Sequence, residues 1–86
     1  MQNTTGLFSE SRYLRCMEEN HIYCNIFLTN GFQMHSVAIL EHDDTAMMVD
    51  VNGIQQMVYR RAISTIVPLH PVRLENDYRQ MDGDGE

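Results

Sequence analysis

The chain has 86 residues, which is enough for one small domain. Six basic and twelve acidic residues give a net charge of −6 at pH 7, and all six basic residues are arginine. Such acidity argues against unselective binding to nucleic acid or to anionic membranes, so any RNA or DNA site must be local. No apolar run approaches the roughly 20 residues of a membrane span, and the N-terminus lacks a signal-peptide pattern. The sequence therefore predicts a cytoplasmic protein.

The first predicted element is a helix at about residues 7–20, preceded by a flexible segment at residues 1–6. Ser9 can cap this helix, and Glu10 favours its positive first turn. Tyr13, Leu14 and Met17 fall on one face at helical spacing. Because this apolar face is narrow, we expect the helix to lie on the outside of the domain.

Five strands without intervening helices are predicted between about residues 22 and 67. The first alternates in hydrophobicity and ends at Asn30-Gly31, a two-residue hairpin signal, because both residue types tolerate positive φ. Later strands are expected at 32–40, 45–51, 54–61 and 63–67, with a second hairpin at Asn52-Gly53. The polar cluster at 41–44 should end the second strand. This order predicts a mainly β protein with one N-terminal helix and a small antiparallel barrel.

A barrel of five strands leaves edge strands, which can pair with a neighbouring chain by aggregation or in a closed ring. A chain of this size buries only about 60–65% of its surface, so self-assembly would supply missing burial. The ordered domain should cover residues 7–72. Residues 73–86 carry five acidic side chains and few apolar ones, which predicts a disordered acidic tail.

Residues with catalytic or metal-binding chemistry are present but poorly arranged. Cys16 and Cys24 have neither a disulfide-framework nor a zinc spacing, so two buried thiols are expected. The polar residues around the second turn would not converge on one ion without help; they are His35, Glu41, His42, Asp43 and Asp44. No nucleophile–base arrangement or glycine-rich phosphate loop occurs. We expect no enzyme activity, no cofactor and no metal site.

Phe27, Phe32 and Met34 form the first group of candidate functional residues. Phe27 falls on the outward parity of its strand, and the other two follow the Asn30-Gly31 turn. Exposed aromatic rings beside a turn can stack on nucleobases, although local packing or a subunit contact would use the same residues. Gln33 and Gln56 could read base edges or simply face solvent.

Tyr59-Arg60-Arg61 forms the second group. One aromatic ring beside two guanidinium groups suits phosphate binding and ring stacking. The competing interpretation is that Asp43 and Asp44 neutralise the arginines.

The segments from Val58 to Pro68 and from Phe27 to Met34 carry two contiguous motifs. The first resembles the second Sm motif of the bacterial Hfq family of Sm-like RNA chaperones, and the other resembles the first two strands of that family, particularly of its Gram-positive branch. The resemblance covers about residues 7–68. It implies an N-terminal helix on a strongly bent five-stranded sheet, closed edge to edge into a homohexameric ring that binds single-stranded RNA and modulates the pairing and stability of small RNA and mRNA.

The resemblance also implies two RNA-binding surfaces. The distal surface, away from the helices, would take A-rich or purine-rich RNA. Its positions fall on Phe27, Leu28, Asn30, Gly31, Phe32, Gln33, Met34, Gln56 and Thr65.

The proximal surface, which would take U-rich RNA around the pore, matches Tyr59, Arg60 and Arg61 but departs from the family. Arg61 replaces the usual histidine, Asp43 replaces a neutral or basic residue, and the family's base-stacking aromatic aligns best with Asp44. We therefore expect altered proximal binding.

Glu18 and Glu19 lie where many family members carry a basic rim, which predicts weak strand annealing. The acidic turn, helix end and tail also suit an alternative role, a ring that acts mainly as a protein-interaction module.

Overall fold

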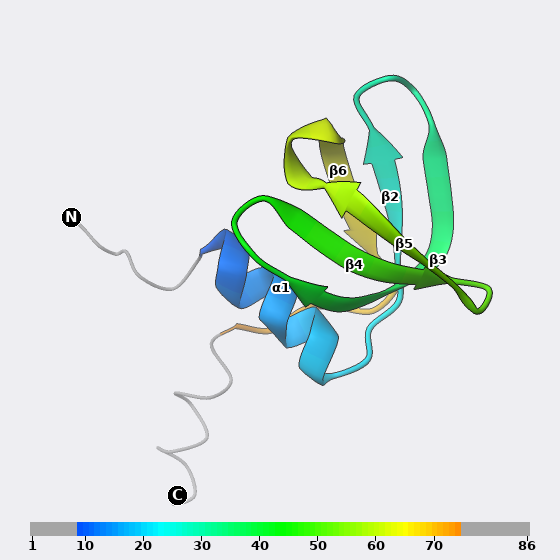
Figure 1. Ribbon diagram of the computed structural model, residues 1–86. Coiled ribbons are helices and arrows are strands. Elements are labelled where there is room, and N and C mark those ends of the chain that lie inside the picture. Colours follow the sequence, from blue (N-terminus) through cyan, green and yellow to red (C-terminus); the bar gives the residue numbers. More distant parts are fainter. Residues whose placement is uncertain (1–8, 75–86) are drawn as a thin grey trace, which may run out of the picture.

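The computed structural model describes residues 9–74 and confirms the predicted fold class of one helix followed by a bent antiparallel sheet (Figure 1). The five strands form a single sheet in the order β5-β4-β3-β2-β6, so β5 and β6 are its two edges. Helix α1 packs against β3, and the β2–β3 turn lies at the end of the molecule away from the helix (Figure 1). The predicted flexible N-terminal segment, and the predicted acidic tail from residue 75 onward, lie outside the described residues.

Helix α1 spans Glu10–Glu19 and is defined by a cap at each end. Ser9 caps the N-terminus by accepting a hydrogen bond from the backbone N–H of Arg12 at 3.1 Å. At the other end, His21 has a φ of 54°, and the N–H of Ile22 donates to the carbonyl of Met17 at 3.0 Å. This pattern is a Schellman motif, in which a left-handed residue ends the helix.

The strands follow the predicted order with shifted ends. β3 continues through Glu41 and His42, where the sequence predicted a break, and β5 ends at Tyr59, two residues earlier than predicted. Arg60–Ala62 instead forms a short 3-10 helix, η1. The strands are β2 (Cys24–Leu28), β3 (Gln33–His42), β4 (Ala46–Val51), β5 (Ile54–Tyr59) and β6 (Ile63–Pro68).

Three register shifts bend the sheet. At the first, Cys24 pairs with Val37 while Ile26 pairs with Met34, so β3 carries one extra residue. Ser36 lies in this bulge with a φ of 54°, and its N–H donates to Oδ1 of Asn25 at 3.0 Å. The other shifts fall between the pairs of β3 with β4 and of β2 with β6. Bulges increase the local bend and twist, which lets so small a sheet curl around its core.

The two hairpin turns differ. Asn52 and Gly53 both have positive φ, 55° and 85°, as predicted for a two-residue turn. At the first turn the expected two-residue geometry is wrong, because among Asn30 and Gly31 only the glycine has a positive φ, 93°. The N–H of Leu28 donates to the carbonyl of Phe32 at 2.8 Å, which closes a three-residue loop.

The core lies between α1 and the concave side of the sheet. Leu14 and Met17 supply its helical side, as the spacing predicted, and the strands supply Cys24, Ile26, Met34, Val37, Ile39, Met47, Val49 and Val58. Burial raises the pKa of the Cys24 thiol to about 11, so this cysteine is an apolar core residue. Cys16 is only half-buried, contrary to the expectation of two buried thiols. Within residues 9–74 no helix has the length and apolarity needed to span a membrane.

Candidate nucleic-acid interface

Phe27 occupies the middle of a row of side chains that crosses three strands. It pairs with Gln33 of β3 on one side and with Thr65 of β6 on the other. Directly paired residues of neighbouring strands lie on the same face of a sheet, so these three side chains form one continuous surface. The structure thus brings together three of the predicted distal residues: a ring, an amide and a hydroxyl.

The β2–β3 turn places a second aromatic ring next to this row. Phe32 is 65% exposed, and its backbone N–H donates to Oδ1 of Asn30 at 2.9 Å. Gly31 supplies the positive φ that the turn needs, and nothing lies within 4 Å of the position where a Cβ would stand. The Leu28 side chain is half-buried and packs against the core. Its contribution to the turn is therefore through its backbone N–H, which donates to the carbonyl of Phe32.

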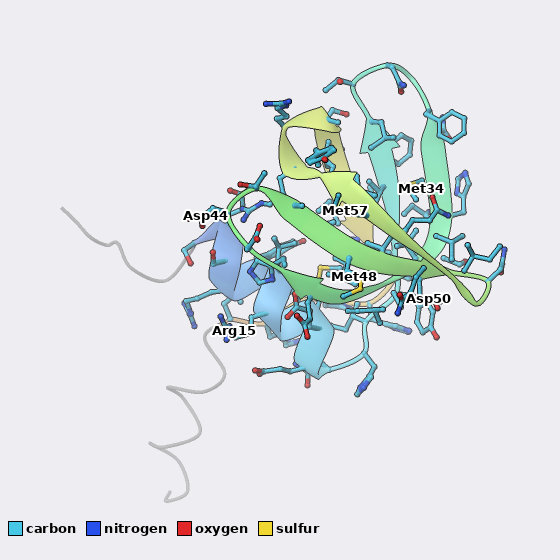
Figure 2. The ribbon with its side chains drawn as sticks, in the orientation of Figure 1. Arg15, Met34, Asp44, Met48, Asp50 and Met57 are labelled. Atoms are coloured by element: carbon cyan, nitrogen blue, oxygen red, sulfur yellow. The ribbon has the colours of Figure 1, made fainter. Side chains whose placement is uncertain are left out.

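Two predicted distal residues stand apart from this surface within the chain. Met34 is only 9% exposed and belongs to the core, so its side chain does not provide the exposed apolar wall that the sequence suggested (Figure 2). Its burial follows from the bulge at Ser36, which puts Met34 and Val37 on the same side of β3. Gln56 is exposed on the edge strand β5, and β4 and β3 separate it from β2.

The second group, Tyr59-Arg60-Arg61, lies at the end of β5 and in η1. Tyr59 is exposed, and the guanidinium carbon of Arg61 lies 6.0 Å from the centre of its ring. The N–H of Arg60 donates to the carbonyl of Thr45 at 2.8 Å, which holds this group against the β3–β4 turn. A cation–π contact thus joins Arg61 to Tyr59, and a backbone hydrogen bond joins Arg60 to the β3–β4 turn.

The Asp43 carboxylate forms its hydrogen bonds with backbone groups of its own turn and, within the described residues, not with the arginine side chains. Its Oδ1 accepts hydrogen bonds from the N–H groups of Thr45 and Ala46 at 2.8 and 2.9 Å. These donors, that of Ala46 first, lower the pKa of the Asp43 carboxyl, and the charge of nearby Arg60 acts in the same direction. Asp43 is thus the residue that fixes the turn.

The ion-pair partner of Arg60 is Glu10, at the start of α1. Nη2 of Arg60 lies 2.7 Å from Oε1 of Glu10, and Nη1 donates to the backbone carbonyl of Asp43 at 2.5 Å. From the sequence, Glu10 was expected only to favour the positive first turn of the helix. Its separation of fifty residues from Arg60 left no local signal for the pair.

The remaining predicted acids have different surroundings. Asp44 is exposed at the β3–β4 turn (Figure 2), and the described part of the chain gives it no hydrogen bond or ion pair. Glu18 contacts Nδ1 of His42 through Oε2 and is largely buried, whereas Glu19 is exposed. Only one of the two glutamates therefore faces solvent as a rim charge. Within residues 9–74, no three His, Cys, Asp or Glu side chains are grouped to hold a metal ion.

A further exposed row continues the Phe27 surface. Val67 pairs with Asn25, and the N–H of Leu69 donates to the carbonyl of Tyr23 at 2.9 Å. Tyr23, Val67 and Leu69 are all exposed. The outward parity of Tyr23 was visible in the sequence, but its pairing with Leu69 required the tertiary structure.

Comparison with known proteins identifies one family. The family model described as "Hfq protein" matches residues 10–73, which is most of the described chain. A crystal structure of "the pleiotropic translational regulator, Hfq" is 31% identical with a TM-score of 0.64, and the match covers 67% of this chain and 95% of that one.

Curated relatives of the chain carry the name "RNA-binding protein Hfq". That of Oceanobacillus iheyensis is 34% identical over 79% of this chain and 90% of its own length. That of Ruminiclostridium cellulolyticum is 38% identical over 86% and 89%, and that of Moorella thermoacetica is 37% identical over 92% of both chains.

Proposed function

The chain belongs to the Hfq family, and we propose that it is an RNA chaperone that binds A-rich or purine-rich single-stranded RNA on its distal surface. The curated relatives are RNA-binding proteins, which favours this role over that of a protein-interaction module. The mechanism has no chemical step. It raises the local concentration of bound RNA in the cytoplasm by base stacking at repeated weak sites.

The observation that carries the distal assignment is the row of Gln33, Phe27 and Thr65 beside the exposed ring of Phe32. Aromatic rings on an open sheet face can stack on the bases of a single strand, and the amide and hydroxyl can hydrogen-bond base edges. Purine selectivity would then come from the larger stacking area of two-ring bases.

A homohexameric ring accounts for Gln56, which one chain leaves apart from Phe27. The two free edges of the sheet are β5 and β6. If β5 of one chain pairs with β6 of the next, Gln56 comes beside the neighbouring β6 strand, which carries Thr65. Each distal site would then draw residues from two chains.

The test is the substitution Phe32→Ala, with oligo-A binding measured by fluorescence anisotropy at two salt concentrations. Removing one base-stacking ring costs about 1–3 kcal/mol, so we expect affinity to fall by about 5- to 150-fold. Leu40→Ala is the matched control, because Leu40 is an exposed apolar residue of β3 outside the distal row.

Two outcomes contradict the proposal. If the Phe32→Ala variant binds oligo-A as tightly as the wild-type protein does, the distal assignment is wrong. A wild-type protein that binds neither oligo-A nor oligo-U would favour the protein-interaction module. True phosphate contacts must also weaken steeply as salt rises.

A further inference from the structure

Arg60 and Arg61 are adjacent in the sequence but have different electrostatic surroundings. Arg60 is 12% exposed, and its guanidinium contacts the Glu10 carboxylate at 2.7 Å and the Asp43 carbonyl at 2.5 Å. Arg61 is exposed, and within the described residues it has no carboxylate partner, only the ring of Tyr59. The guanidinium of Arg60 is therefore already paired within the protein, whereas that of Arg61 can still pair with a bound anion.

Glu10 is held in place by the helix and not by its pairing with Arg60. It is the first residue of α1, directly after the Ser9 cap, and buried Leu14 and Met17 fix the helix on the sheet. The Glu10 side chain is 72% exposed. An ion pair so exposed contributes little to folding stability, so its main consequence is for what Arg60 can bind.

Glu10 and Arg60 also meet at the same hollow of the surface. A cavity of about 210 Å³ between α1 and β6 is lined by both residues together with Tyr13, Leu14 and Ser64. A phosphate or uracil approaching Arg60 here meets a carboxylate that repels the phosphate and already occupies guanidinium donors.

We propose that Glu10 is a specificity-determining residue that withholds Arg60 from RNA, so that Arg61 is the working cation of the proximal surface. The inference rests on the proposed RNA-binding function but not on the distal A-rich site. It explains how a chain with two arginines in this motif would still bind U-rich RNA weakly: the second positive charge is cancelled within the protein.

The test is Glu10→Gln, which keeps the size of the side chain and removes its charge. We expect oligo-U affinity to rise on the order of 10-fold, because Arg60 gains the freedom to make a charge-assisted phosphate contact. Each new contact should steepen the dependence of log affinity on log salt by about 0.7. Fluorescence anisotropy with labelled oligo-U at four salt concentrations measures both quantities.

Glu19→Gln is the matched control, because it removes the same charge from an exposed position of the same helix. Within residues 9–74, Glu19 has no arginine partner. General electrostatics would make both variants bind oligo-U equally, with equal salt slopes, and that result would overturn the proposal.

Arg60→Ala in two backgrounds adds an independent test. We expect it to abolish the gain of Glu10→Gln, whereas in the wild-type protein Arg61→Ala should weaken oligo-U binding more than Arg60→Ala does. If Arg60→Ala weakens wild-type binding as much as Arg61→Ala does, Arg60 already contacts RNA and the inference is wrong. Oligo-A binding, unchanged in the Glu10→Gln variant, separates this failure from failure of the distal assignment.

Discussion

The Asp43 carboxylate shows how a single side chain fixes a functional turn. The carboxylate accepts hydrogen bonds from the backbone N–H groups of Thr45 and Ala46, and the backbone carbonyl of Asp43 accepts one from the guanidinium of Arg60. The turn between β3 and β4 and the start of η1 are thereby held together. The sequence left open whether this carboxylate neutralises the arginines, and in the structure its hydrogen bonds go to backbone donors.

Asp43→Asn should destabilise the protein in a pH-dependent way. The pKa of Asp43 is lowered below its ordinary value of 3.8, so its carboxylate stabilises the fold above that pH and loses the contribution as pH falls through the lowered pKa. We expect the wild-type protein to be more stable than the variant at pH 7, with the difference shrinking below about pH 4. Urea unfolding followed by circular dichroism from pH 2.5 to 7 measures it. A difference independent of pH would mean that charge is irrelevant at this position.

At the scale of elements, helix α1 depends for its stability on packing against the sheet. Ten residues are too few for a stable isolated helix in water, so its stability comes from packing. Leu14 and Met17 enter the core, and Nη2 of Arg12 donates to the carbonyl of Leu74 at 2.7 Å. The contact of Glu18 with His42 ties the last turn of α1 to β3.

Leu14→Ala should therefore cost about 2–5 kcal/mol of the free energy of unfolding, because it leaves a cavity where the helix meets the sheet. Arg15→Ala on the exposed face of the same helix should change stability by no more than about 0.5 kcal/mol (Figure 2). Urea unfolding at equal chain concentration compares the two variants. Equal losses would show that α1 docking contributes nothing specific.

At the scale of the whole molecule, the two free edges of the sheet determine how the protein can assemble with copies of itself. Directly after β5, the N–H of Arg60 donates to the carbonyl of Thr45, directly before β4. Because N–H directions alternate along an antiparallel strand, the N–H of Met57, three residues earlier, points away from β4. The Met57 side chain is 61% exposed. Met57 therefore offers a backbone donor to a neighbouring chain at little cost to its own core.

Met57→Pro should reduce the proposed ring to smaller species while each chain keeps its fold, because proline removes the outward donor from an edge strand. The control Met57→Ala retains the N–H and should assemble as the wild type does. Sedimentation velocity gives the mass, with six times the 10.0 kDa chain expected for the wild-type protein. A Met57→Pro variant that still sediments as a hexamer would show that β5 does not form the ring contact.

The sequence by itself determined the order of elements, the helix cap at Ser9, the Asn52-Gly53 hairpin and the two motifs that identified the family. These features depend on local periodicity, local backbone preference or a contiguous motif, so neighbouring residues are enough to predict each of them. Tertiary structure alone decided the bulge that buries Met34, the three-residue loop at Gly31 and the pairing of Arg60 with Glu10. Each of these depends on strand register or on a contact between distant segments, which local composition does not encode.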